Sequence, residues 1–515
     1  MTLTHAQQLV QRSLLPPAAA AQLALAIGGD HVRVVADVRV MHAGGLAYLD
    51  LVRRHAGIVT TAPDAVALPR THDEVGRVLA TCSRHRVAVV PFGGGTSVVG
   101  GVEPLRGAFA SVVTVDLTRM DRLVSVDRDS LTATFEPGIT GAAAEKLLNQ
   151  RGLTLGHFPQ SFERATLGGY VATRSAGQAS AGYGRIDDLV VGLRVASPIG
   201  GLRLGRAPGS AAGPDLLHLF LGSEGTLGII TEITLQVRPE PLRRLYDAWL
   251  VPNFATGLEV VRQLAQSAGT PDVLRLSDEA ETKAALEMSS PGGIAGRALG
   301  GYLRRRGVAA GCLVILGWEG DHDDVRHRRQ RGRERLRKAR GVPLGKRAAE
   351  SWRKGRYAGP YLRDQLLDAG YLVETLETAT FWSRIAPLHA RVSAALNTAL
   401  RNPANPPYVM CHVSHVYPTG ASLYFTVLAG VRLGQESKQW QQAKAAANKA
   451  IVAAGATITH HHAIGIDHRS HLVDEIGPLG VQALRAVKRT FDPVGVLNPG
   501  KLLPDPESPS AKESR

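Results

Sequence analysis

The stretch FPQSFERATLGGYVATRSAGQASAGYGRIDDLVVG, residues 158–192, consists mostly of glycine, hydroxyl-bearing and other small residues, and apolar runs typical of strands flank it. Side chains this small bury little apolar surface, so the segment cannot be the centre of a hydrophobic core. It contains three loops rich in backbone and hydroxyl hydrogen-bond donors, namely Gln160–Gly169, Thr173–Gly177 and Gly182–Asp188. We therefore expect this part of the chain to lie against a ligand.

Two more loops of the same kind lie outside this stretch. PFGGGTSVVGG (91–101) directly follows a predicted buried strand at Val87–Pro91, and GSEGTLG covers 222–228. Glycine lets backbone N–H groups converge on phosphate oxygens without interference from a Cβ. The first loop lacks the lysine of a Walker motif, and Val98 stands where a Rossmann loop has its third glycine. One such loop can be a plain tight turn, but five separated by strands indicate one long, polyanionic ligand, such as a dinucleotide cofactor.

The length and texture of the chain predict several domains. Its 515 residues, 44% hydrophobic and 20% charged, suit a globular protein of two or three domains. A strand, a helix beginning near Thr71–His72 and a second strand open a βαβ unit after Ala62. The predicted parts are a helical region at 1–60, a nucleotide-binding domain at 61–241, a cap at 242–455, a segment at 456–505 that returns to the shared site, and a disordered tail at 506–515.

Cysteine usage and the absence of long apolar runs indicate a cytoplasmic protein. The three cysteines lie far apart without CxxC spacing, which favours a reducing compartment. No apolar run is long enough to predict a membrane-spanning helix. Residues 13–29 read as the start of a helical hairpin rather than a secretory signal. The C-terminal tail lacks the S-K-L ending of a peroxisomal signal.

The net charge of +15 is unevenly distributed. The segment RHRRQRGRERLRKAR, residues 326–340, carries nine Arg or Lys residues and one Glu. It is either a solvated helix face or a surface that contacts anionic phospholipid, since each basic residue near such a membrane contributes about 1 kcal/mol. Aromatic residues that could stack on bases are not interleaved with these charges, so we expect no nucleic-acid partner.

The motif THHHAIG (459–465) concentrates titratable groups. It follows AGATI, which we expect to be a strand, so His460 and His462 would share a face and His461 would point away. A metal site formed by His460, His462 and His468 is one alternative, and structural histidines are another. We favour a catalytic cluster without a metal, in which adjacent imidazoles disfavour each other's protonation and hold their pKa values near neutrality.

A second candidate site residue lies in the predicted strand ASLYFTV (421–427). Tyr424 is surrounded there by apolar neighbours. A tyrosine in such a strand is either a packed ring with one satisfied hydroxyl or a buried functional group, and the local sequence leaves both open.

Several of these motifs, in a fixed order, resemble those of a known superfamily. PFGGGTS, SFERATLGGYVATRSAG, YGRIDDLVVGLRVASPIG and GSEGTLGIITE resemble the flavin-binding domain of the vanillyl-alcohol oxidase / para-cresol methylhydroxylase superfamily, over roughly residues 60–505. The resemblance implies an α+β fold with a two-subdomain FAD-binding domain, an α+β cap domain and a C-terminal segment that returns to the active site. It also implies non-covalently bound FAD.

The same resemblance implies FAD contacts from four segments. The residues are Pro91, Phe92, Gly93, Gly94, Gly95, Thr96, Ser97, Gln160, Ser161, Phe162, Glu163, Arg164, Ala165, Thr166, Thr173, Arg174, Ser175, Ala176, Glu224, Gly225, Thr226, Leu227, Gly228, Ile229 and Ile230.

Within the superfamily, the chain is most similar to the alkyldihydroxyacetonephosphate synthase branch. PDVLRLSD, PYLRD, CHVSHVYPTGASLYF and THHHAIG carry this resemblance. Oxidases of D-2-hydroxy acids typically have Glu-His-Gly-Ile/Val-Gly where this chain has HHHAIG, although the ending FDPVGVLNPGKLL looks more like theirs. The resemblance implies exchange of the acyl group of acyl-dihydroxyacetone phosphate for a long-chain alcohol, without net redox. The alternative is a flavin-dependent oxidase or dehydrogenase of a 2-hydroxy acid.

The branch resemblance also assigns roles to individual residues. Tyr424 matches the base that removes a proton beside the ketone, and the histidine cluster would lower the pKa of this tyrosine or relay its proton. Arg363 and Arg275 would bind the substrate phosphate, for which the guanidinium fork is well suited. The expected partners are a lipid-like small molecule and a second copy of the chain in a homodimer.

Overall fold

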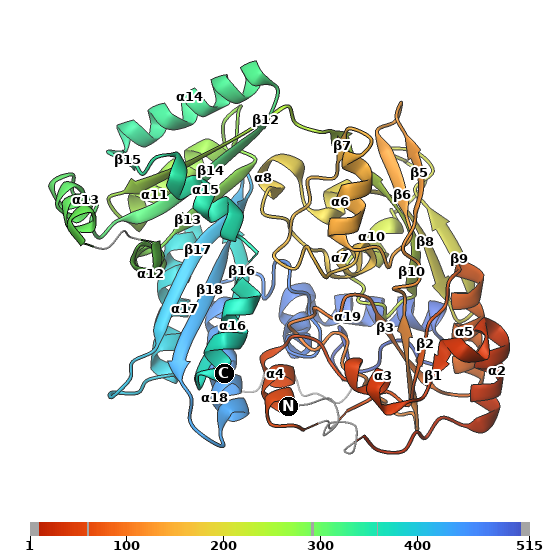
Figure 1. Ribbon diagram of the computed structural model, residues 1–515. Coiled ribbons are helices and arrows are strands. Elements are labelled where there is room, and N and C mark those ends of the chain that lie inside the picture. Colours follow the sequence, from red (N-terminus) through yellow and green to blue (C-terminus); the bar gives the residue numbers. More distant parts are fainter. Residues whose placement is uncertain (1–9, 59–60, 290–292, 358, 506–515) are drawn as a thin grey trace.

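The computed structural model describes residues 10–58, 61–289, 293–357 and 359–505. Four sheets organise these parts of the chain. Figure 1 shows a seven-stranded sheet on one side and the smaller sheets, formed by the first half of the chain, on the other. The predicted mixed α+β fold is confirmed. The predicted tail at 506–515 lies outside the described residues.

The first sheet contains the expected strand–helix–strand unit. Its order is β1-β2-β4-β3, with β1 Val32–Arg33, β2 Ala65–Ala67, β4 Val112–Asp116 and β3 Ala88–Phe92. Helix α5 (His72–Arg84) joins β2 to β3, and its N-cap Thr71 accepts a hydrogen bond from the backbone N–H of Glu74. Strand β4 pairs in parallel with both β2 and β3 and therefore lies between them. The glycine loop leaves the carboxyl end of β3, where ligands bind in parallel sheets.

The second sheet is antiparallel and packs its apolar face under short helices. Its order is β5 Leu123–Asp127, β6 Thr132–Phe135, β10 Ile229–Gln236, β8 Val190–Ser197 and β9 Gly200–Leu204, and a two-stranded sheet joins β11 Arg238–Pro239 to β7 Leu153–Thr154. The helices of this part are α6 Gly141–Asn149, α7 Leu167–Thr173, α8 Ser180–Tyr183, α9 Ile186–Leu189 and α10 Leu217–Phe220. A buried core that includes Phe135, Leu167 and Ile233 joins these elements.

The seven-stranded sheet forms the centre of the second half of the chain. Its order is β15 Val342–Pro343, β12 Arg243–Val251, β14 Cys312–Gly320, β13 Val273–Ser277, β17 Tyr408–Val416, β18 Gly420–Gly430 and β16 Tyr371–Phe381. The helices are α11 Phe254–Ala265, α12 Glu279–Ser289, α13 Gly293–Arg305, α14 His322–Lys338, α15 Lys346–Gly355, α16 Gly359–Asp368, α17 Ile385–Ala399 and α18 Glu436–Ala453. Leu423, Phe425 and Val427 of β18 belong to one buried core with α17 and α18. The alternate residues of β18 therefore face the opposite side.

The C-terminal segment returns to the first two sheets. Helix α19 (Leu472–Phe491) ends with Phe491 against Phe220 of the second core. Leu497 then forms a parallel bridge with Val89 of β3. The chain thus passes from the seven-stranded sheet back to the strand that precedes the glycine loop.

Among the described residues before β2, the α-helices are α2 (Pro17–Ile27), α3 (Ala36–Met41) and α4 (Tyr48–His55). The remaining short helices are η1 Gly29–His31, η2 Trp382–Arg384 and η3 Arg469–His471. In the described part of the chain, none of the helices has the length and apolar character needed to cross a membrane.

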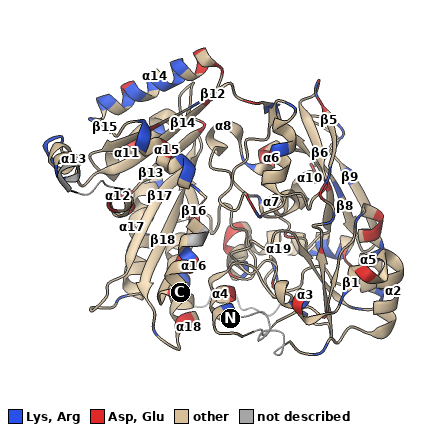
Figure 2. Cartoon of the chain, in the orientation of Figure 1, with Lys and Arg blue, Asp and Glu red and all other residues tan. Residues whose placement is uncertain are grey.

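Helix α14 contains most of the Arg-rich segment, and Figure 2 shows its basic residues along the edge of the molecule. Several of these side chains hold the helix on its own sheet. Arg328 forms an ion pair with Asp272 at 2.9 Å, and Arg329 forms one with Asp247 at 2.6 Å. The exposed basic residues are Arg326, Arg331, Arg337, Lys338 and Arg340. The high charge of this segment is therefore partly structural.

Candidate functional site

A pocket lies between the first two sheets, at the end of β3. Its lining is Pro91, Phe92, Gly93, Ser97, Gly101, Val102, Leu117, Thr166, Gly168, Gly169, Ala172, Thr173, Glu224, Gly225, Gly228, Ile229, Ile230 and Ala463. Members of all four segments predicted to contact FAD take part. Loops from different parts of the first half of the chain thus meet around one cavity.

Close backbone packing between loops forms one wall of this pocket. A Cβ on Gly94 would overlap the carbonyl oxygen of Arg164, and a Cβ on Gly93 would overlap the hydroxyl of Thr166. Gly95 has a φ of +63°, a conformation that favours glycine. The PFGGG loop therefore lies directly on the loop that begins at Gln160.

Several predicted flavin contacts do not line the pocket, and three of them make contacts elsewhere. The backbone of Arg174 ends α7 in the left-handed region, with φ 53°. The hydroxyl of Ser175 lies 2.7 Å from Nε2 of the buried His157. The ring of Phe162 stacks on Tyr357 at 5.6 Å between centroids. In this structure, Ser175 and Phe162 thus contact other parts of the protein.

The pocket fits the cofactor that its loops predicted. Its side-chain polar groups include the hydroxyls of Ser97, Thr166 and Thr173, while much of the remaining lining is glycine backbone or apolar. A dinucleotide needs N–H and hydroxyl donors for its phosphates and apolar walls for its rings. Glycines packed this closely leave backbone, rather than side chains, facing the ligand.

Glu224 joins the pocket to the C-terminal segment. Its carboxylate accepts hydrogen bonds from the backbone N–H groups of Ile464 at 2.9 Å and Gly465 at 2.8 Å. Its own carbonyl accepts one from Nδ2 of Asn498 at 2.6 Å. Burial raises the pKa of Glu224 to about 7, against the lowering effect of these backbone donors and of Lys501.

A row of polar side chains crosses the seven-stranded sheet on the face opposite its core. Tyr424 of β18 is directly opposite Glu377 of β16 and His412 of β17. Directly opposite residues in antiparallel strands share a face, so the three side chains are neighbours. The His412 ring stacks on Tyr424, with centroids 4.9 Å apart. Strand register thus brings Glu377 beside His412 and Tyr424, which lie 35 and 47 positions further along the chain.

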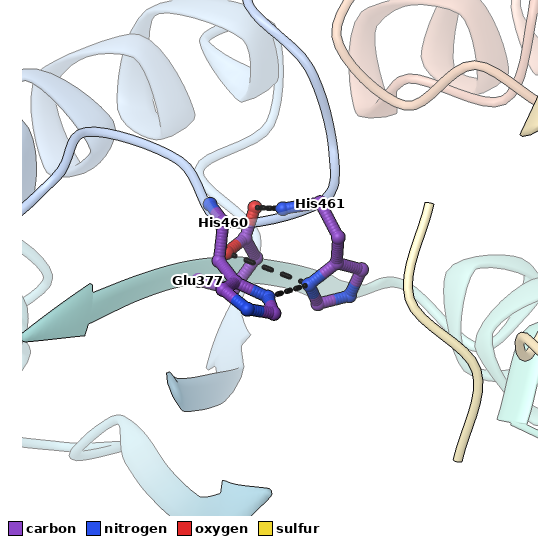
Figure 3. A group of neighbouring side chains, drawn as sticks. All are labelled: Glu377, His460 and His461. Carbon is purple, nitrogen blue, oxygen red and sulfur yellow. Dashed lines mark hydrogen bonds and ion pairs between the residues drawn. The ribbon is translucent and has the colours of Figure 1, made fainter. Parts of the chain in front are cut away.

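The histidine motif forms a turn over this row, and the expected strand at AGATI is wrong. Residues 460–462 are bends, and only Thr457 bridges β16, through Ala379. Figure 3 shows the reason, which is the carboxylate of Glu377 beneath the segment. It accepts hydrogen bonds from the backbone N–H groups of His460 at 2.6 Å, His461 at 3.1 Å and His462 at 2.9 Å. Three successive N–H groups converge on one carboxylate only where the chain curls.

This curl corrects the expected orientation of the histidines. The rings of His461 and His462 both lie near Tyr424, with centroids 6.1 and 5.5 Å from the phenol ring. His460 turns away, with Nε2 2.7 Å from the hydroxyl of Tyr417 and Nδ1 3.0 Å from Nδ1 of His461. The two rings nearest the tyrosine are therefore consecutive residues.

A fourth histidine of the cluster, His415, was missed by the sequence reasoning. A register shift in β17 between Ser414 and Val416 gives it a φ of 46° and turns it out of the strand alternation. Its ring lies 4.9 Å from that of His461, and its Nδ1 lies 2.9 Å from the hydroxyl of Ser180 in α8. This hydroxyl links the first half of the chain to the cluster.

Burial overturns the expected near-neutral pKa values of the histidines. Burial lowers the pKa of His461, lowers that of His462 to about 3 and lowers that of His460 well below its ordinary value. Nearby Glu377 opposes each shift but does not cancel it. The imidazoles are therefore neutral at pH 7 in the resting protein.

The expected lowering of the tyrosine's pKa is also wrong for the resting protein. Burial raises the pKa of Tyr424 to about 12, with further raising effects from Glu374 and Glu377 and lowering effects from Thr375 and Arg363. Neutral imidazoles supply no positive charge to counter the burial. A phenolate at this position therefore needs a proton acceptor or an added positive charge.

The two predicted phosphate-binding arginines lie in different surroundings. Arg363 of α16 has a side chain only 11% exposed, with a guanidinium nitrogen 3.9 Å from the buried carboxylate of Glu374. Its Nε is buried without a hydrogen-bond partner. Arg275 of β13 donates to Glu281 at 2.6 Å and contacts Nε2 of His412 at 3.1 Å. Arg275 is thus already neutralised, whereas Arg363 keeps unused donor capacity.

One group of potential metal ligands occurs among the described residues, and it differs from the three-histidine alternative. Atoms of Glu377, His460 and His461 lie within 4.8 Å of one another. However, the two imidazoles already hydrogen-bond each other, and the carboxylate already accepts four hydrogen bonds, including one from Thr459. These bonds account for the cluster, and we assign it no metal.

The residues that the sequence reasoning missed had a detectable signal. Glu374 and Glu377 lie in the otherwise strand-like YLVETLETATF, and carboxylates inside a buried strand are expected only when paired. His412 and His415 stand in the motif CHVSHV, three residues apart. A charged residue in an apolar strand was therefore the clue, but its partner could not be read from the sequence.

Comparisons with known families agree with the pocket and its loops. Residues 63–204 match the model of the FAD binding domain, and residues 240–502 match that of the C-terminal domain of FAD linked oxidases. A solved p-cresol methylhydroxylase has the same fold, with a TM-score of 0.70 at 17% identity over 94% of this chain and 96% of its own. The protein is therefore an FAD-dependent enzyme with a p-cresol-methylhydroxylase-type fold.

Closer relatives define the branch. The chain is 33% identical to the alkyldihydroxyacetonephosphate synthase of Dictyostelium discoideum over 92% of this chain and 79% of that protein. A solved alkyldihydroxyacetonephosphate synthase matches 95% of the chain, and 87% of its own, with a TM-score of 0.81 and 31% identity. The chain belongs to the alkyldihydroxyacetonephosphate synthase family.

Proposed function

We propose that this enzyme exchanges the acyl group of acyl-dihydroxyacetone phosphate for a long-chain alcohol and releases a fatty acid, without net redox. The observation that carries the proposal is the row of Glu377, Tyr424 and His412 beneath two neutral imidazoles. This arrangement suits removal and return of a proton, and the substrate needs this at the carbon beside its ketone. The names of the relatives favour the same substrate class.

Tyr424 is the proposed base. Its phenol proton would pass to a neighbouring neutral imidazole, because His461 and His462 contact its ring. The phenolate then takes the proton from the substrate carbon, and the steps reverse after the exchange. Neutral histidines are the form that can accept a proton, but their lowered pKa values and the raised pKa of Tyr424 oppose the transfer. The transfer therefore needs the negative charge of Glu377, which lies beside both rings.

Arg363 is the proposed phosphate ligand, and Arg275 acts with it only indirectly. Arg363 has an unpartnered buried donor and one distant carboxylate partner. A phosphate would supply the charge-assisted hydrogen bonds that Glu374 at 3.9 Å does not. Arg275 instead orients His412, which stacks on Tyr424.

FAD, when bound, supplies an electron-accepting ring next to this site. We propose that the residues named for it from the sequence hold it non-covalently, since the pocket they form offers backbone and hydroxyl donors. Ala463 belongs both to the pocket and to the segment that carries the histidines. This shared residue supports placing the reacting carbon between the flavin ring and Tyr424.

The decisive test is anaerobic mixing with substrate while flavin absorbance is recorded. We expect labelled hexadecanol and acyl-dihydroxyacetone phosphate to give the ether product and free fatty acid, with the flavin oxidised at the end. Lasting bleaching by a small 2-hydroxy acid, with no alcohol exchange, would instead identify an oxidase.

We also propose a homodimer, a cytoplasmic location and peripheral contact of α14 with anionic lipid, together with the domain limits predicted above. The exposed basic residues of α14 that are not tied to the sheet support the lipid contact. Cosedimentation with phosphatidylserine vesicles, at low and high salt, tests it. Binding that survives high salt, or no binding at either, contradicts an electrostatic contact.

A further inference from the structure

Glu377 is a buried carboxylate whose hydrogen-bond donors come from outside its own sheet, from residues 459–462. Its side chain is fully buried, directly across the β16–β18 ladder from Tyr424. The carboxylate accepts three backbone hydrogen bonds from residues 460–462 and a fourth from the hydroxyl of Thr459 at 2.6 Å. A buried carboxylate is tolerated only when paired and hydrogen-bonded, and here a single turn of chain provides all four donors.

The same carboxylate faces the two rings that contact Tyr424. Its oxygens lie 3.6 Å from Nδ1 of His461 and 4.0 Å from Nδ1 of His462. A fixed negative charge at this range, out of water, favours a proton on either ring. Glu377 thus contacts both the backbone that places the imidazoles and the nitrogens that would carry the proton.

We propose that Glu377 is a positioning residue that holds the histidine turn against Tyr424 and stabilises the imidazolium formed when the tyrosine gives up its proton. This inference rests on the proposed function. The proton leaves the phenol oxygen, resides on His461 or His462 during the exchange and returns afterwards, so no net proton or electron is consumed.

The charges around the turn agree with this role. Burial raises the pKa of Glu377, but the neighbouring imidazoles, when protonated, and the hydrogen bond from Thr459 lower it well below its ordinary value. The carboxylate therefore stays ionised. Other groups also act on the imidazoles, from several packed elements. They are Arg185, His412, His415, Lys444 and His468. Glu377 is the acidic group that raises the pKa of all three histidines of the turn.

The test replaces Glu377 with glutamine in the flavin-loaded enzyme. Glu377→Gln keeps the size and several acceptor bonds but removes the charge. We expect normal flavin content, a kcat lowered at least about 10-fold, and little change in KM. Since less negative charge lowers the histidine pKa values further, the acid limb of the pH profile should move to lower pH by about one unit. Histidine ¹³C NMR should show the same shift without substrate.

Two further variants separate charge from mere support. Thr459→Val removes one donor and leaves the charge, so the acid limb should stay in place. Glu377→Asp keeps the charge on a shorter side chain, so kcat should fall while the acid limb of the pH profile stays at the same pH. This variant also replaces Glu377→Gln as the test if the glutamine variant does not fold. The inference is overturned if Glu377→Gln changes neither the acid limb of the pH profile nor the titration of the histidines. It is also overturned if Glu377→Asp shifts the acid limb. If wild type lacks alcohol exchange but the NMR shift appears, only the proposed reaction fails.

Discussion

The flavin pocket and the row on the seven-stranded sheet are built in opposite ways. The pocket is lined by glycine backbone, hydroxyls and apolar side chains, brought together by loops that follow strands. The row consists of titratable side chains on neighbouring strands, held by register and by hydrogen bonds from a distant turn. A ligand that must be held needs donors and space, whereas a proton that must move needs groups whose charge can change.

This difference indicates which substitutions each region can tolerate. In the pocket, adding a methyl group at Gly93 or Gly94 disturbs the close packing between loops. On the row, size matters less than the ability to hold or release a proton. Four variants probe the contrast.

Tyr424→Phe should have the largest effect. It removes only the hydroxyl, so the half-buried ring still packs on His412 and the flavin should remain bound. We expect turnover to fall by roughly 10²–10⁴-fold, the usual contribution of general acid–base catalysis. Steady-state assays with flavin quantified by absorbance measure both quantities. Near-normal turnover would show that Tyr424 only packs in the protein, and the contrast between a binding pocket and a proton-transfer row would then be wrong.

Gly94→Ala should disrupt the pocket rather than the chemistry. The added Cβ would overlap the Arg164 carbonyl oxygen, and backbone cannot move aside as a flexible side chain can. We expect most of the flavin to be lost from the soluble protein. Gly76→Ala is the matched control, because a Cβ there meets nothing within 4 Å and the site is helical. That variant should keep its flavin and gain about 0.5–1 kcal/mol of stability.

Arg363→Lys should affect the substrate and leave the flavin untouched. Lysine retains the charge but loses the fork that binds phosphate in two places. We expect affinity for the phosphorylated substrate to fall by roughly 1.5–3 kcal/mol per charged hydrogen bond lost. Isothermal titration with the phosphorylated and dephosphorylated ligands tests this, with exposed Arg391→Lys as the control. A loss of affinity for a small 2-hydroxy acid instead would favour an oxidase.

Glu224→Gln should have the smallest effect, seen as a change in pH dependence. The raised pKa of about 7 means that the folded protein binds this proton more tightly than the unfolded chain. The contribution to stability is present below the ordinary glutamate pKa and is lost as pH rises through about 7. The Tm of wild type, relative to the variant, should therefore fall by a few degrees between pH 5 and 7. A constant difference across this range would contradict the buried, protonated state.

The sequence could predict the flavin half better than the cap half. The loops of the flavin half could be recognised, because five loops rich in glycine and hydroxyl residues occur in one half of the chain. Tyr424 and the histidines were also found, but their arrangement was not. Periodicity places a residue on a face, yet it does not tell which strand pairs with which, so the position of Glu377 opposite Tyr424 was hidden. The turn at 460–462 was mistaken for a strand because the carboxylate that curls it lies 83 residues earlier.

The return of the C-terminal segment to β3 also determines when the pocket can be completed during protein synthesis. Asn498 reaches back to the carbonyl of Gly101, 397 residues earlier in the chain. A ribosome adding about 5–20 residues each second would need roughly 20–80 s to cover that distance. Throughout that interval the first glycine loop, residues 91–101, has been synthesised without the segment that closes it. The complete pocket therefore cannot close around FAD until nearly the whole chain has been synthesised, so stable cofactor binding follows translation of the C-terminal segment.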